Sequence, residues 1–107
     1  MNNILYTGTS GQGPDLILLH GLFGQGGNLR SVARALETDF RVHCVDLPDH
    51  GRSPWLAAAS LATYAAAVRD WMEQRQLKAG HIRGHSLGGK VAMELALTEP
   101  ARVEKLV

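Results

Sequence analysis

Short apolar runs alternate along the chain with longer segments whose apolar residues recur every three or four positions. The run Asp15–His20 is almost wholly apolar and is bounded by turn-forming residues, which predicts a strand buried on both faces. The next strand in this pattern is Phe40–Val45. Shorter strands are predicted at Asn3–Thr7, around Ile82, and from Arg102 to the end of the sequence.

Two helices are predicted between these strands. In Leu29–Leu36 the apolar residues fall at positions i, i+3, i+4 and i+7, and Asn28 is placed to cap the helix N-terminus. The second helix has Ser60 as its N-cap and continues to about Gln76. Its apolar stripe consists of Leu61, Tyr64, Ala65, Val68, Trp71 and Met72.

A third helix is predicted over Gly89–Leu97, and Pro100 stops it. The segment Gly8–Pro14 is rich in turn formers and predicts a hairpin between the first two strands. The resulting order, β-β-α-β-α-β-α-β, indicates an α/β fold with a largely parallel sheet and helices on both faces. We expect residues 1–107 to belong to one domain, without an internal repeat or linker.

Composition restricts the function classes only moderately. The chain has 107 residues, of which 45% are hydrophobic and 20% charged, with a formal net charge of +1. Near-neutrality gives no reason to expect nucleic acid or an anionic membrane as a partner. The single cysteine, Cys44, excludes an internal disulfide. No signal peptide, membrane span or metal-ligand spacing is recognised, so a cytoplasmic location without a metal is expected.

The strongest candidate for chemistry is Gly84–Gly88, a G-x-S-x-G pentapeptide between a predicted strand and a predicted helix. Such a turn strains the serine backbone and pushes the hydroxyl out of the sheet, while flanking glycines leave room for close backbone packing. The following helix directs its N–H groups and its positive dipole end at the serine oxygen. These features favour Ser86 as a nucleophile for carbonyl groups. An incidental serine at a helix start is the alternative.

A second motif, His20–Gly24 (HGLFG), follows an earlier buried strand. An oxyanion hole needs two converging backbone donors, one from the residue after the nucleophile, Leu87, and one from this loop. Leu22 is the preferred second donor and Phe23 the near alternative. Taken alone, the loop is equally well explained as a glycine-rich turn beside a core histidine.

The polar loop Asp46–Ser53 (DLPDHGRS) also follows a strand, at the sheet edge where open α/β proteins place their sites. Hydrogen bonds that lock the loop explain Asp46, His50 and Ser53 better than catalysis does. His85 is expected to be packed or hydrogen-bonded and not to act as a general base.

A phosphate-binding loop is the competing interpretation of the same segment. Gly84–Val91 nearly satisfies G-x-x-x-x-G-K-[ST], but Val91 occupies the position where a hydroxyl should hold magnesium. Nucleotide binding is therefore disfavoured, and Lys90 is interpreted as a solvated helix residue.

Three motifs in this order, His20–Gly24, Asp46–Ser53 and Gly84–Lys90, resemble the α/β-hydrolase superfamily. The similarity runs from Leu16 to Val107. The first and third motifs more narrowly resemble small bacterial carboxylesterases and thioesterases of a family that also includes a mitochondrial abhydrolase.

The resemblance implies a serine hydrolase that acts on a small-molecule ester or thioester through an acyl-enzyme and uses no cofactor. It implies Ser86 as the nucleophile and the amides of Leu22 and Leu87 as oxyanion donors. It also disfavours haloalkane dehalogenases and epoxide hydrolases, whose nucleophile at this turn is an aspartate. A cofactor-free haloperoxidase or a lyase on the same scaffold, or a non-catalytic binding protein, stays open.

The chain departs from the family pattern after the serine. The family's triad runs serine, then acid, then histidine, but no histidine follows Ser86 in this sequence. Glu94 and Glu99 belong to the helix after the serine and to its end, where neither could orient a base. We therefore expect an N-terminal portion of an α/β-hydrolase domain, cut within a strand, lacking its cap segment and inactive by itself.

Overall fold

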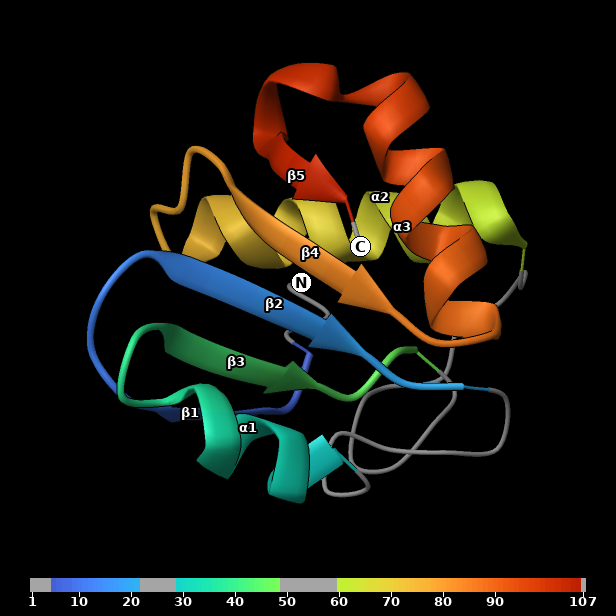
Figure 1. Cartoon of the computed structure of the whole chain (residues 1–107). Helices are drawn as coiled ribbons and strands as arrows, with labels where there is room; N and C mark the ends of the chain where they lie inside the picture. Colours follow the sequence, from blue (N-terminus) through green and yellow to red (C-terminus); the bar gives the residue numbers. More distant parts are fainter. Residues whose placement is uncertain (1–4, 22–28, 49–59, 107) are drawn as a thin grey trace.

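The computed structural model describes residues 5–21, 29–48 and 60–106, and its elements follow the predicted order (Figure 1). The strands are β1 (Thr7–Ser10), β2 (Asp15–Leu19), β3 (Arg41–Val45), β4 (Gly80–Gly84) and β5 (Val103–Leu106). The helices are α1 (Arg30–Leu36), α2 (Leu61–Gln74), α3 (Leu87–Thr98) and the short 3-10 helix η2 (Pro100–Arg102). The predicted α/β class is confirmed.

The described strands form one sheet in the order β1-β3-β2-β4-β5, in which β1 alone is antiparallel to its neighbour. The last residue of β2, Leu19, is in register with Val45 of β3 and with Gly84 of β4. Because these three strands are parallel, the segments that follow them leave the sheet from one edge. All three sequence motifs begin at that edge, where open α/β sheets bind their ligands.

Helices cover both faces of the sheet, as predicted. Helices α2 and α3 pack on one face, and α1 packs on the other (Figure 1). Strand β2 is buried on both faces because it lies in the middle of the sheet, which explains its continuous apolar run. The larger core contains Leu5, Ile17, Leu19, Val45, Leu47, Tyr64, Ala65, Val68, Trp71, Met72, Ile82, Val91, Ala92 and Leu95. The smaller core under α1 contains Leu16, Leu18, Ala33 and Val42.

The first strand differs from the prediction. It begins at Thr7, not at Asn3, and it pairs with β3, so the expected hairpin with β2 does not form. The turn before β2 instead packs against the connection between α1 and β3. Gly11 and Gly13 have φ values of 86° and 128°, and a Cβ on either would overlap a backbone carbonyl of that connection. The turn-forming residues of Gly8–Pro14 were identified correctly from the sequence. They do not specify which strand β1 pairs with.

The helix boundaries agree closely with the predictions. The expected N-cap of α2 is present as a capping box, in which Ser60 and Thr63 each accept a hydrogen bond from the other's backbone N–H. The predicted stripe of α2 is buried except for Leu61, which is 38% exposed. Helix α1 begins one residue later than predicted, with Leu29 at its N-cap position, and Asn28 lies outside the described residues. No helix in the described segments is long and apolar enough to cross a membrane.

A buried histidine beneath α2 carried no signal in the sequence. His43 Nε2 lies 2.9 Å from Asp15 Oδ1, and its Nδ1 lies 3.0 Å from Thr9 Oγ1. Its ring and that of Trp71 form a T-shaped pair, with centroids 5.4 Å apart and planes inclined by 76°. Burial lowers the pKa of His43 below its usual 6.5, and the hydrogen bond that its ring donates to Asp15 opposes that shift without reversing it.

This lowered pKa predicts a pH-dependent contribution to stability. The unfolded chain binds the His43 proton more readily than the folded chain does. The contribution is therefore complete above the unfolded value of 6.5 and is lost as the pH falls from there through the folded pKa. At about pH 8 we expect the unfolding free energy of wild type to be about 1–3 kcal/mol higher than that of His43→Gln. At about pH 5 the difference should be smaller. Urea titrations of both proteins measure this difference, and a difference that is constant or larger in acid would contradict it.

Candidate active site

The predicted strand, turn and helix around Ser86 are present. Strand β4 ends at Gly84, α3 begins at Leu87, and Ser86 occupies the N-cap position between them. The Ser86 backbone has φ 56° and ψ −114°, a strained conformation for a residue with a side chain, and the residue is exposed. We refer to Gly84–Gly88 as the serine turn.

Close backbone packing explains both glycines of the serine turn. A Cβ added at Gly84 would overlap the Gly88 carbonyl and lie 2.5 Å from the nitrogen of Gly89. A Cβ added at Gly88 would overlap the carbonyl oxygen of Leu19, at the end of β2, and lie 2.6 Å from that of His20. The serine turn therefore folds onto itself and onto the adjacent strand, with no room for a side chain at either position.

Hydrogen bonds fix the serine turn, and the Leu87 N–H beside the serine is not among their donors. The His85 N–H donates to Leu19 O at 3.1 Å, which ties the turn to β2. The Gly88 N–H donates to His85 O at 3.0 Å, and the Lys90 N–H donates to Ser86 O at 3.1 Å. For the Leu87 N–H, no backbone acceptor occurs among the described residues. This amide opens the 12-residue helix α3, where unpaired N–H groups and the helix dipole favour a negative charge.

The start of the second motif lies directly against the serine turn. A Cβ added at Gly21 would be 3.3 Å from His85 Cδ2 and 3.4 Å from Ser86 Cβ. The fold therefore brings together two segments that lie more than sixty residues apart in sequence. The remainder of this motif, including the expected donor Leu22 and its alternative Phe23, lies outside the described residues.

His20 is buried at the base of this loop, with 1% of its surface exposed. Its Nε2 accepts the Leu47 N–H at 2.9 Å, and its Nδ1 lies 2.7 Å from the Gly21 carbonyl oxygen. The ring thus connects the segment after β2 to the segment after β3. The structural alternative from the sequence, a core histidine beside a glycine-rich turn, therefore agrees with the burial of His20.

The third motif is only partly described. Asp46 is 2% exposed, and its backbone N–H donates to Tyr6 O at 2.9 Å. The start of the motif is therefore packed into the fold, as expected for a structural segment. His50 and Ser53 lie outside the described residues, so their expected loop-locking bonds remain predictions.

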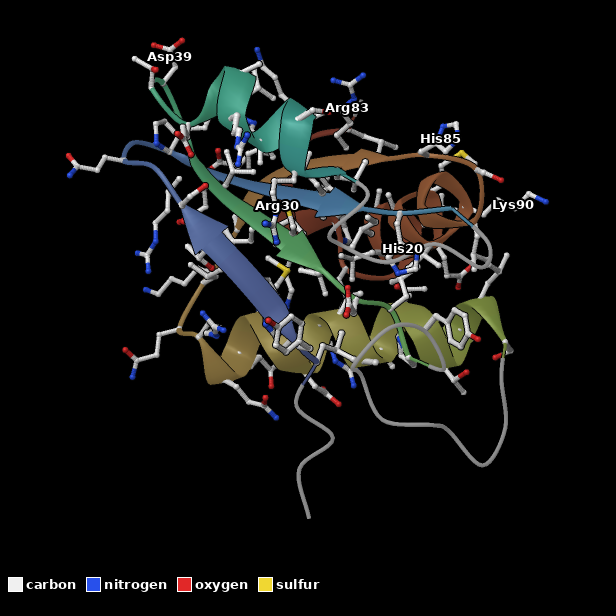
Figure 2. All side chains as sticks on the ribbon, turned by 90° about the horizontal axis from the view of Figure 1, so that it is seen from below. His20, Arg30, Asp39, Arg83, His85 and Lys90 are labelled. Carbon is white, nitrogen blue, oxygen red and sulfur yellow. The ribbon has the colours of Figure 1, made fainter. Side chains whose placement is uncertain are left out.

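Two basic side chains, Arg83 and Lys90, lie on the surface beside the serine turn, together with His85. Arg83, His85 and Lys90 are all exposed, and Figure 2 shows them along the same side of the molecule. His85 was expected to be packed or hydrogen-bonded; its exposure shows that it is not buried, although its Cδ2 lies close to Gly21, and the hydrogen-bonded alternative stays a prediction. A cavity of about 260 Å³ lies behind the turn, and Ser86 does not line it. Its described lining is Leu18, Leu19, Leu29, Val32, Arg83, Gly84 and His85. Within the described segments, no three potential metal ligands cluster.

The close contacts of the serine turn predict that alanine substitution destabilises the protein more at Gly88 than at Gly8. Gly88→Ala should lower the unfolding free energy by about 2 kcal/mol or more, because the new methyl group meets the rigid backbone of β2. Gly8→Ala is the control, since a Cβ there has no neighbour within 4 Å, and its effect should stay below about 1 kcal/mol. Chemical denaturation measures both, and equal effects would contradict this description of the turn.

Comparison with known proteins assigns the chain to a family. The model of the alpha/beta hydrolase fold matches residues 14–107. An sn-1-specific diacylglycerol lipase ABHD11 of Xenopus tropicalis is 43% identical over 105 residues, which are 96% of this chain and 33% of that protein. A pimeloyl-acyl-carrier-protein methyl ester esterase of Nitrosospira multiformis is 43% identical over 106 residues, covering 96% of this chain and 40% of that protein.

The solved structure of a marine microorganism esterase matches with a TM-score of 0.95 and 37% identity, over 98% of this chain and 41% of that chain. The chain thus spans between a third and about two fifths of the length of the relatives it matches. With the fold, the serine turn and the family model in agreement, the chain belongs to the α/β-hydrolase family.

Proposed function

We propose that this chain is the nucleophile-bearing portion of a serine hydrolase that cleaves a carboxylic ester or thioester. The observation that carries the proposal is the strained, exposed Ser86 beside the Leu87 N–H at the start of α3. An exposed serine hydroxyl next to an amide N–H at a helix N-terminus is the combination that attack on a carbonyl requires. The names of the relatives, a lipase and two esterases, support ester hydrolysis as the reaction class.

In the proposed reaction, Ser86 Oγ attacks the carbonyl carbon of the substrate and its proton passes to a base. The electron pair of the carbonyl moves onto oxygen, and the amides of Leu87 and Leu22 donate hydrogen bonds to the resulting oxyanion. Collapse of this intermediate expels the alcohol or thiol, which takes the proton, and leaves the acyl group on Ser86. Water then attacks the acyl-enzyme, releases the acid and restores the serine. The steps assign no role to a metal or cofactor.

The base is proposed to come from residues beyond Val107. No histidine follows Ser86 in the sequence, although the α/β-hydrolase order places one after it. The histidines before Ser86 in the described segments are otherwise engaged: both ring nitrogens of His20 and of His43 have partners, and His81 Nε2 lies 3.4 Å from Glu104 Oε2. His85 precedes the nucleophile directly and has its ring edge against Gly21.

Replacing the proposed nucleophile tests the function in the full-length protein. Ser86→Ala should lower kcat for p-nitrophenyl acetate by at least about 10³-fold and abolish labelling by a fluorophosphonate probe, because both need an activated serine oxygen. Ser31→Ala, at an exposed position of α1, is the matched control and should retain both. A Ser86→Ala protein that keeps either property would refute the nucleophile assignment. Unlabelled wild type would instead favour a non-catalytic binding protein.

The 107-residue chain by itself should show little or no turnover. Without a base, only the modest catalysis of oxyanion binding remains. Steady-state hydrolysis of p-nitrophenyl acetate measures this, with Ser86→Ala of the same chain as the background. An esterase-like rate that this substitution abolishes would show that the chain already contains a working base.

A further inference from the structure

We propose that β4 and β5 form a docking surface on the α1 side of the sheet. Its occupant is a segment of this chain that follows Val107 and presents a carboxylate to Arg83. The inference rests on the proposed function, which takes the chain as one portion of a longer hydrolase. The lengths of the relatives support this, because the chain covers only 33% of the matched lipase and 40% of the matched methyl ester esterase.

Within the described residues, β4 and β5 are covered on one face only. On the face of α2 and α3, Ile82 of β4 is fully buried and Val103 of β5 packs against the same core. The smaller core under α1 draws its described strand residues from β2 and β3, and none of them comes from β4 or β5. Both strands pair in parallel, and parallel strands are ordinarily covered on both faces. A second layer is therefore expected over the α1 side of β4 and β5.

Arg83 lies on this bare face. Successive side chains of a strand point to opposite faces, so the burial of Ile82 under α2 and α3 places His81 and Arg83 on the α1 side. Figure 2 shows Arg83 beside α1, away from α2. His81 has partners there, since its ring pairs with Phe40 and its Nε2 lies 3.4 Å from Glu104 Oε2. Arg83 is exposed, and the ion pairs formed among the described residues do not include it.

The charge of Arg83 determines what the covering segment must carry. A guanidinium group is not deprotonated in proteins, so Arg83 keeps its charge when a second layer removes it from water. A buried charge without a partner is strongly destabilising. A carboxylate is the matching partner, because its two oxygens accept the parallel N–H groups of the guanidinium fork. The segment that covers β4 must therefore bring an aspartate or a glutamate to this position.

The cavity beside Arg83 adds an apolar requirement. Its volume is about 260 Å³, and Leu18 of β2, Leu29 and Val32 of α1 are among its described lining residues, together with Arg83. The apolar walls favour an apolar side chain, and the guanidinium at the side favours a carboxylate. An amphipathic segment with an apolar residue near an acidic one meets both requirements. A helix packed beside α1 would present such a pair and complete the second layer over β4 and β5.

A zero-length crosslink tests the contact in the full-length protein. The Arg83→Lys variant places an amine at this position, and a water-soluble carbodiimide joins an amine only to a carboxylate that contacts it. We expect peptide mass spectrometry to find an amide bond between residue 83 and an aspartate or glutamate beyond Val107. The matched control, Arg34→Lys at an exposed position of α1, should not react with that carboxylate.

Other products of the same reaction would overturn the inference. A crosslink between two copies, recognised in a mixture of unlabelled and ¹⁵N-labelled protein, would show that a second copy covers the face. A crosslink to a carboxylate within residues 1–107, or none at residue 83, would show that no later segment supplies the carboxylate. Ser86-dependent hydrolysis of p-nitrophenyl acetate by wild type reports separately on the proposed function, so either proposal can fail alone.

Protection of the arginine gives a second test that needs no variant. Phenylglyoxal modifies accessible guanidinium groups of the folded full-length protein. If a segment covers Arg83, its modification must wait for local opening, so it should be at least about tenfold slower than that of exposed Arg34. Equal rates at the two arginines would overturn docking at this face.

Discussion

The candidate active site depends on the close backbone contact between the serine turn and the end of β2. Because Gly88 packs onto the carbonyls of Leu19 and His20, the chain must turn sharply between β4 and α3. Ser86 takes the positive φ that this turn requires, at a cost on the order of 1–3 kcal/mol. Burial of Val91 and Leu95 of α3 against the sheet offsets that cost, so the strain persists in the folded protein.

Parallel pairing extends this constraint to the rest of the site. Since Leu19, Val45 and Gly84 are in register, the loops after β2, β3 and β4 begin side by side. His20 then joins the first two of these loops through one ring, while the His85 N–H joins the third to β2. The site is thus assembled mainly from backbone groups whose directions are set by the sheet. Side-chain chemistry enters through few residues, of which Ser86 is the central one.

The sequence predicted those parts of the molecule whose signals are local. The serine turn needs glycine at fixed offsets between a strand and a helix, and the N-cap of α2 needs a residue such as Ser60 directly before the helical stripe. The partner of β1 could not be predicted, because turn residues do not specify which strand is reached across the sheet. The bonds of His43 to Asp15 and Thr9 were missed for the same reason, since they join three separate strands.

The most direct test of the account is to locate the acyl group during turnover. The full-length protein would be mixed with p-nitrophenyl acetate, quenched in acid within the first turnovers and analysed by peptide mass spectrometry. The account predicts an acetyl group on Ser86, absent from unreacted protein. Acetylation at a different residue, or rapid hydrolysis with Ser86 unmodified at every quench time, would contradict it.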